Sequence, residues 1–370
     1  MNWHEPAPGE SEAGQRTWRV VREAFTERLP APRKVNWRPL AAAAVGVALL
    51  AAAFTPPGHA VLGSIREAVQ GEKNAKPALS SLPSPGTRLL VNSAQGAWVV
   101  QSDGSKRLLG GYSNSSWSPH GLYLAAVQGD ELRAIEPNGT RRWSIGRAGR
   151  LLAPRWSYDG FRIAYFSGRA LRVINGDSTG DRLLTRAVQI GVSAWQPGTH
   201  TLAYVNRRGD IQIVDVDRPA RHAVVRTRIA PTQLHWTPDG RTLVAVGPHV
   251  IAVFGQRGGQ LRRLDRGRAF VVAASVSPDG KSLAFVETEA GRSSLQLTGI
   301  AAGPTRELLP GAGRFTNVIW APDGRWLLLD WHSADQWLFI RSVAVKKIIA
   351  VSNIRANFGA EPSLAGWCCP

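Results

Sequence analysis

Residues 236–244 read WTPDGRTLV, and variants of this stretch recur along the 370-residue chain. Each copy joins an aromatic or aliphatic residue to a turn and then to an aliphatic residue seven positions later. The copies begin at Trp117, Trp156, Trp195, Trp236, Val276 and Trp320. They lie about 40 residues apart, which is the length of one four-stranded β-propeller blade. The repeat therefore predicts an all-β propeller.

The turn chemistry explains why the motif has this form. Proline presets φ at the start of a turn, an aspartate side chain accepts hydrogen bonds from turn N–H groups, and glycine adopts the positive φ that a tight hairpin needs. We therefore interpret the motif aspartates as turn-formers, with no metal-binding or catalytic role. They are Asp159, Asp239, Asp279 and Asp323.

The two ends of the repeat region complement each other. Residues 88–109 (RLLVNSAQGAWVVQSDGSKRLL) contain later strands of a blade but no motif before them. Residues 364–367 (LAGW) resemble the missing first strand. A shared blade would close the ring and remove exposed sheet edges. We expect about seven four-stranded blades over 88–370, with six as the alternative.

The N-terminal part has a different composition. Every residue from Pro39 to Phe54 is apolar or glycine, and the residues before this run are rich in arginine. We predict a cytoplasmic basic segment over 1–38, a transmembrane helix over 39–56, and a juxtamembrane helix and linker over 57–87. The positive-inside rule then predicts a single-pass cell-membrane protein with its propeller outside the cytoplasm. A signal peptide cleaved near Ala60 and a buried soluble helix are the alternatives.

The formal net charge of +18 favours an anionic partner. The basic residues are scattered, and no nucleic-acid recognition motif is present, so we expect no nucleic-acid partner. We expect instead the membrane itself and a protein, peptide or anionic polymer. The oligomeric state stays open.

The repeat of this chain resembles that of a known family. The pattern Trp-Ser-Pro-Asp-Gly-x-x-Leu-Ala is similar to the WD-like repeat of TolB-like propellers, over about three quarters of the chain. This resemblance implies a binding platform. TolB proteins are periplasmic and have six blades and a separate N-terminal domain, so their partners are not carried over.

Enzyme signatures are missing from the sequence. It contains no GxSxG elbow, Walker loop, HExxH or paired Cys/His spacing, and we expect no catalytic residues, cofactor or metal. A hydrolase or lyase built from loops on the same scaffold is the alternative function. Cys368 and Cys369 are adjacent, and we expect two thiols there in preference to a disulfide.

A candidate rim for an anionic partner follows from propeller topology. The loops between the second and third strands of a blade share one face with the loops between successive blades. Arg150 and Arg228 lie in such loops. The candidate rim residues are Arg147, Arg207, Arg208, Arg266, Arg268, Arg292, Arg314, Trp331 and His332.

Overall fold

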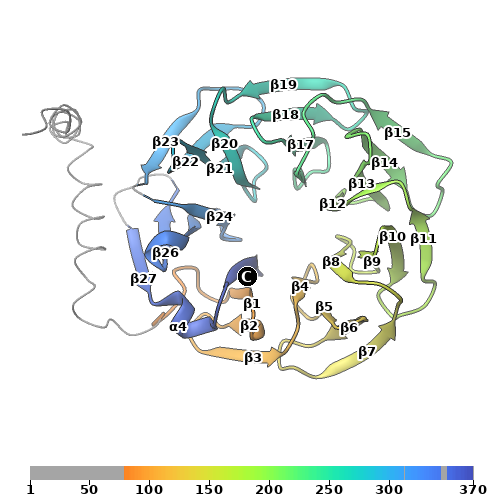
Figure 1. The fold of residues 1–370 in the computed structure, drawn as a ribbon, viewed down its shortest axis with the longest axis horizontal. Coiled ribbons are helices and arrows are strands. Elements are labelled where there is room, and N and C mark those ends of the chain that lie inside the picture. Colours follow the sequence, from red (N-terminus) through yellow and green to blue (C-terminus); the bar gives the residue numbers. More distant parts are fainter. Residues whose placement is uncertain (1–78, 312, 343–347, 370) are drawn as a thin grey trace, which may run out of the picture. The chain divides into compact units, whose positions relative to one another are not determined.

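The computed structural model describes residues 79–369, except 312 and 343–347. These residues form seven four-stranded sheets that follow one another around a ring (Figure 1). The seven-blade prediction is confirmed over the six-blade alternative. The segments predicted at 1–38 and 39–56, and most of the segment at 57–87, lie outside the described residues. Within the described part, no helix has the length and apolar character that a membrane span requires.

The first four blades are sheets in which neighbouring strands run antiparallel, and strand order in each is inner to outer. Blade 1 comprises β28 (Ser363–Cys368), β1 (Arg88–Ser93), β2 (Gly96–Val100) and β3 (Lys106–Gly110). Blade 2 comprises β4 (Asn114–Trp117), β5 (Leu124–Gln128), β6 (Glu131–Ile135) and β7 (Arg141–Gly146). Blade 3 comprises β8 (Leu151–Trp156), β9 (Arg162–Ser167), β10 (Ala170–Asn175) and β11 (Arg182–Thr185). Blade 4 comprises β12 (Val188–Trp195), β13 (Thr201–Asn206), β14 (Ile211–Asp215) and β15 (His222–Val225).

The remaining three blades repeat this arrangement. Blade 5 comprises β16 (Gln233–Trp236), β17 (Thr242–Val246), β18 (Val250–Gly255) and β19 (Gln260–Asp265). Blade 6 comprises β20 (Phe270–Val276), β21 (Ser282–Glu289), β22 (Arg292–Gly299) and β23 (Arg306–Pro310). Blade 7 comprises β24 (Phe315–Trp320), β25 (Trp326–Trp331), β26 (Gln336–Arg341) and β27 (Ile348–Ser352). Two short helices, η2 (His332–Ala334) and α4 (Ile354–Phe358), lie in loops.

The ring closes as the sequence predicts. The C-terminal strand β28 pairs antiparallel with β1, so that Leu89 lies opposite Trp367. The indole N–H of Trp367 also donates to the Thr87 hydroxyl. Blade 1 is thus built from both ends of the described chain. The structure joins Cys368 and Cys369 as a disulfide, which differs from the two thiols expected from the sequence.

The motif turns adopt the predicted chemistry. In blade 5 the Asp239 carboxylate accepts hydrogen bonds from the Thr237 hydroxyl at 2.6 Å and from the Arg241 N–H at 3.0 Å. These bonds, the Thr237 one foremost, lower the pKa of Asp239. Gly240 takes a φ of +67°. The aspartates at the same place in blades 3, 6 and 7 accept the corresponding backbone bonds, which confirms that they form turns.

The motif tryptophans join neighbouring blades. The indole N–H of Trp195 donates to the Arg155 carbonyl of the preceding inner strand at 3.0 Å, and that of Trp320 donates to the Ser275 carbonyl at 3.0 Å. Their rings are buried in hydrophobic clusters that span adjacent sheets. A residue of one blade therefore completes the core between two blades, which is why the repeat specifies a ring.

Residues 79–87 pack onto the ring, although the sequence places them in the linker. Leu79 and Leu82 are buried, and the Leu82 N–H donates to the Ser102 carbonyl at 2.9 Å. The Ser84 hydroxyl donates to Asp323, in the motif turn of blade 7. Residues 79–87 therefore pack as part of the propeller domain, whose start the sequence places at residue 88.

Candidate partner-binding face

The alternating strand directions divide the loops of the ring between two faces. We call the face with the motif turns and the third-to-fourth strand turns the turn face. We call the opposite face, with the second-to-third strand turns and the connections between blades, the loop face. Each predicted rim residue lies in loop-face segments of blades 2 to 7 or at the strand ends beside them. The structure therefore places these residues on one face of the ring.

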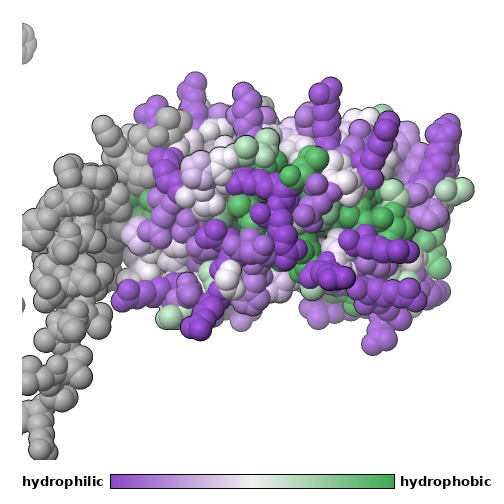
Figure 2. All heavy atoms as spheres, turned by 90° about the horizontal axis from the view of Figure 1, so that it is seen from above, coloured by the Kyte–Doolittle hydropathy of each residue, from purple (hydrophilic) through white to green (hydrophobic). Residues whose placement is uncertain are grey.

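The loop face carries many arginines whose side chains have no hydrogen-bond or ion-pair partner among the described residues. They are all exposed: Arg150, Arg169, Arg186, Arg207, Arg208, Arg226, Arg228, Arg268, Arg292 and Arg314. The carboxylates of the motif turns lie on the other face. Figure 2 views the ring from its edge and shows hydrophilic side chains projecting from both rims, with hydrophobic residues between them.

Arg207 and Arg208 are the clearest members of this set. They occupy the hairpin between β13 and β14, where the Asn206 side-chain carbonyl accepts a hydrogen bond from the Arg208 N–H at 2.8 Å. The turn is therefore fixed by its backbone, while both guanidinium groups remain exposed to solvent. Two neighbouring guanidinium charges, offset in part by Asp210 of the same hairpin, create a local positive potential that attracts polyanions.

Arg147 is engaged inside the structure. Its guanidinium forms an ion pair with Asp181, at 2.6 Å from Nη2 to Oδ2. Arg172 makes a second ion pair with the same carboxylate at 2.6 Å, and the Tyr165 hydroxyl donates to it at 2.8 Å. Burial acts to raise the pKa of Asp181, but the three donors outweigh it and hold that pKa below its usual value. Burial and this carboxylate raise the pKa of Tyr165 to about 12.

Arg266 is engaged in a similar way. It donates two hydrogen bonds to Glu287, at 2.8 Å from Nε and 2.9 Å from Nη2, and its guanidinium lies 5.3 Å from the centre of the Phe285 ring. Glu287 is itself buried. Arg147 and Arg266 are therefore structural residues at the edge of the loop face.

The two remaining predicted residues are less exposed than the unpaired arginines. Trp331 is only 7% exposed, and its ring packs edge-on against Phe315 in the blade 7 core. The Trp331 ring is therefore a core group and does not reach a partner on this face. His332 begins η2 and is partly buried.

Sequence reasoning missed Arg169, Arg186 and Arg226 as members of the face. They lie in the β9–β10 turn, the β11–β12 connection and the β15–β16 connection. Their signal is positional, because Arg169 follows the second strand of its blade and Arg186 and Arg226 follow the fourth. Counting loop positions across all copies of the repeat would have found them.

Comparisons with known proteins support the propeller fold and go no further. No family model matches the sequence, and no curated protein matches it. Many solved structures do match in fold. Hsv2 of Kluyveromyces marxianus is 14% identical with a TM-score of 0.55, over 72% of this chain and 93% of that one. The Cps50 (Swd1) β-propeller domain of Myceliophthora thermophila is 13% identical with a TM-score of 0.55, over 74% and 98%. Hydrazine synthase of Kuenenia stuttgartiensis is 16% identical with a TM-score of 0.51, over 62% and 76%.

Proposed function

We propose that this propeller is a binding module whose loop face holds a polyanionic partner, either an acidic protein segment or an anionic polymer. The observation that carries the proposal is the group of exposed arginines on the loop face whose side chains have no partner among the described residues, Arg207 and Arg208 foremost. A surface rich in unpaired positive charge attracts an anionic chain over a distance of about 10 Å at moderate salt and orients it for binding. Protein-binding roles are common among propellers, which supports this assignment by analogy only.

The proposal includes attachment to a membrane through residues 39–56, with the propeller outside the cytoplasm, as in a TolB-like domain that carries its own anchor. Its support is the apolar run and the basic segment before it. Residues 79–87 themselves contact the turn face, where Leu82 bonds to Ser102 and Ser84 bonds to Asp323. Protein that is released from membranes by alkaline carbonate would contradict the anchor.

The polyanion assignment can be tested with the purified full-length chain and poly-L-glutamate as the probe. We expect the affinity to fall by about tenfold or more between about 50 mM and about 500 mM NaCl, because salt screens exposed charges. Charge reversal at Arg207→Glu and Arg208→Glu should weaken binding to a similar degree.

A matched control comes from the same blade. Arg218 and Arg221 are exposed and lie in the β14–β15 turn, on the turn face. Arg218→Glu with Arg221→Glu makes the same change in net charge and should leave binding nearly unchanged. Equal losses in both double variants would show that net charge, and not the loop face, governs binding, and would overturn the proposal.

We propose no catalytic step. The alternative, a loop-built hydrolase or lyase, requires carboxylates, or a nucleophile beside a base, at the channel mouth. The cavity in the central channel has no carboxylate among the described residues that line it. That arrangement favours binding over hydrolysis. Release of product from a panel of esters and glycosides, at a rate proportional to protein concentration, would support the enzyme instead.

A further inference from the structure

The inner strands of the ring enclose a cavity of about 700 Å³. In each copy of the repeat, the residue just before the motif tryptophan position lines this cavity. These residues are Ser116, Arg155, Ala194, His235, Ser275 and Ile319. Only two of them, Arg155 and His235, have long or aromatic polar side chains. They stand two blades apart, with the small side chain of Ala194 between them.

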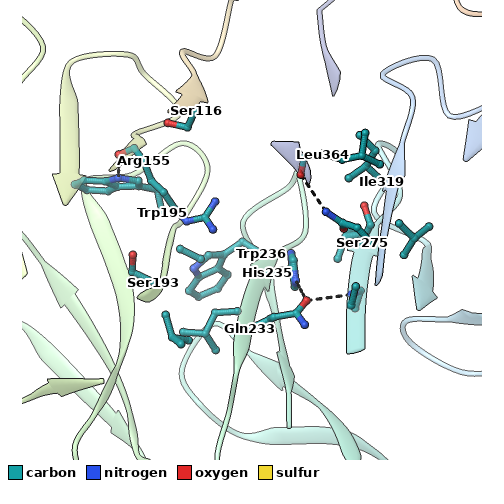
Figure 3. A pocket seen from close by; sticks show the side chains of 18 of the residues that line it. Ser116, Arg155, Ser193, Trp195, Gln233, His235, Trp236, Ser275, Ile319 and Leu364 are labelled. Atoms are coloured by element: carbon teal, nitrogen blue, oxygen red, sulfur yellow. Dashed lines mark hydrogen bonds between the residues drawn. The ribbon is translucent and has the colours of Figure 1, made fainter. Parts of the chain in front are cut away.

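Arg155 is an unpaired cation within this cavity. Its side chain forms no hydrogen bond or ion pair among the described residues, and Figure 3 shows it extending into the cavity toward Trp236 and His235. The surrounding protein displaces part of the water that would solvate the guanidinium. This desolvation lowers the pKa of Arg155. An arginine stays protonated even so. Arg155 is exposed within the channel and has no counter-charge among the described residues that line it, so an anion that enters the cavity can pair with its guanidinium directly.

His235 is the other titratable side chain at this position of the repeat. Its Nε2 lies 3.4 Å from the Gln233 side-chain oxygen, and Gln233 is held by the Val272 carbonyl at 2.9 Å and the Ala274 N–H at 3.0 Å. Burial, followed by the nearby charge of Arg155, lowers the pKa of His235 to about 4. The imidazole is therefore neutral near pH 7, and the Gln233 network fixes its position.

We propose that the central channel binds a small organic monocarboxylate, with Arg155 as the charged anchor and His235 as the second contact. The guanidinium fork matches the two oxygens of a carboxylate. A single fixed charge suits a monoanion better than a phosphate dianion. Apolar walls from Trp236, Val272 and Ile319 suit an apolar body on the ligand. The volume falls within the range of about 300–1,000 Å³ that is common for ligand sites.

The site predicts a coupling between ligand and proton. A bound carboxylate would offset the charge of Arg155 and stabilise an imidazolium, so the pKa of His235 is higher in the complex than the value of about 4 in the free protein. Binding then takes up a proton, and affinity rises as the pH falls from neutrality through the bound pKa. The titratable lining groups are Arg155, Tyr158 and His235.

One carboxyl group lies close behind the cavity wall. Asp330 accepts a hydrogen bond from the hydroxyl of Thr316, which lines the cavity. Burial raises the pKa of Asp330. Its protonation at low pH would also favour an anion, so a variant at His235 is needed to separate the two contributions.

The test uses calorimetric titration of the full-length chain with hexanoate, and with acetate and inorganic phosphate as further arms. We expect hexanoate to bind more tightly than acetate or phosphate. Arg155→Gln should reduce hexanoate affinity by about tenfold or more, because it removes a charged hydrogen-bonded pair. Arg155→Lys should keep part of it. His235→Gln should remove most of the rise in affinity between pH 7 and about pH 5.

The controls separate this site from the loop face. Arg207→Gln with Arg208→Gln should leave hexanoate binding unchanged even if it abolishes polyglutamate binding, so either proposal can fail alone. If Arg155→Gln does not fold, Ala194→Asp places a fixed carboxylate in the neighbouring inner strand and should also abolish binding. Hexanoate binding that persists in both variants, or phosphate binding as tight as hexanoate binding, would overturn the proposal.

Discussion

The turn face of the ring is made of repeated hairpins, whereas the loop face is made of connections that differ from blade to blade. On the turn face, blades 3, 5, 6 and 7 repeat the same aspartate-glycine hairpin, and each aspartate accepts hydrogen bonds within its own turn. On the loop face the connections differ in length and sequence, and most arginines have no partner among the described residues. The residues that recur in the repeat form the turns and the contacts between blades that close the ring. Charged residues that do not repeat, and that the fold leaves unpaired, are those available to a partner.

The largest effect is expected from a glycine of the turn face. Gly240→Ala would place a Cβ 2.7 Å from the Pro197 carbonyl oxygen of the neighbouring blade, at a φ of +67°. Strain and collision together should lower the free energy of unfolding by about 3 kcal/mol. Urea denaturation of the full-length chain measures this.

A glycine near the loop-face end of β12 gives the matched control. Gly191 also has a positive φ, of +86°, but an added Cβ would meet no atom within 4 Å. Gly191→Ala should therefore cost only about 1 kcal/mol, from backbone strain alone. Equal losses in the two variants would show that the contact between neighbouring turns is not what the turn-face repeat preserves.

The second largest change in stability is expected from the loss of the carboxylate that pairs with both Arg147 and Arg172. Asp181 is 5% exposed, and Asp181→Asn should lower the free energy of unfolding at pH 7 by about 2 kcal/mol, because two charged hydrogen-bond partners lose their counter-charge.

The pH dependence follows from the depressed pKa of Asp181. Its contribution is present above the unfolded pKa, near about 4, and is lost as the pH falls through the lower folded pKa. The wild-type protein should therefore approach the stability of Asp181→Asn as the pH is lowered from about 4. A gap between the two that stays constant down to about pH 2 would contradict the role of the ionised carboxylate.

A smaller effect separates two arginines of the same face. Arg147→Gln should destabilise the protein by about 1 kcal/mol, because it removes one of the donors to Asp181 from a partly exposed site. Arg208→Gln should change stability by less than about 0.5 kcal/mol, because its side chain has no described partner. Polyglutamate binding should show the reverse order. Thermal denaturation and titration of both variants measure the two effects.

The sequence was sufficient for the fold because the information is local and repeated. A turn, a strand and an aromatic residue about 40 residues apart specify a blade, and closure follows from the incomplete units at each end. The same reasoning places Arg207 and Arg208 on the correct face, since strand direction alone decides which loops lie together. It does not test what they bind.

The partners of side chains were beyond this reasoning. Asp181 meets Arg147 across an interface between blades, and the alignment of two sheets cannot be deduced from turn motifs. Trp331 lies at the end of a strand, where the sequence pattern does not show whether a side chain is buried or exposed. Arg155 was overlooked because no chemical motif surrounds it, although its place just before Trp156 marks it as a channel residue once the copies of the repeat are aligned.

The smallest effect is expected at the position that follows the motif glycine. Blades 5 to 7 have Arg241, Lys281 and Arg325 there, whereas blades 2 and 3 have Leu122 and Phe161, which are 63% and 71% exposed. Phe161→Ser should change the free energy of unfolding by less than about 0.5 kcal/mol, because the side chain is already in water.

Phe161→Ser should also leave polyglutamate binding unchanged, since an apolar group gives no attraction to a polyanion. Loss of binding in this variant, with stability intact, would mean that the turn face takes part in recognition wherever it departs from the repeat. Unpaired charge would then no longer be the property that distinguishes a binding surface on this ring. Departure from the repeat, whether apolar or charged, would be the more general sign of such a surface.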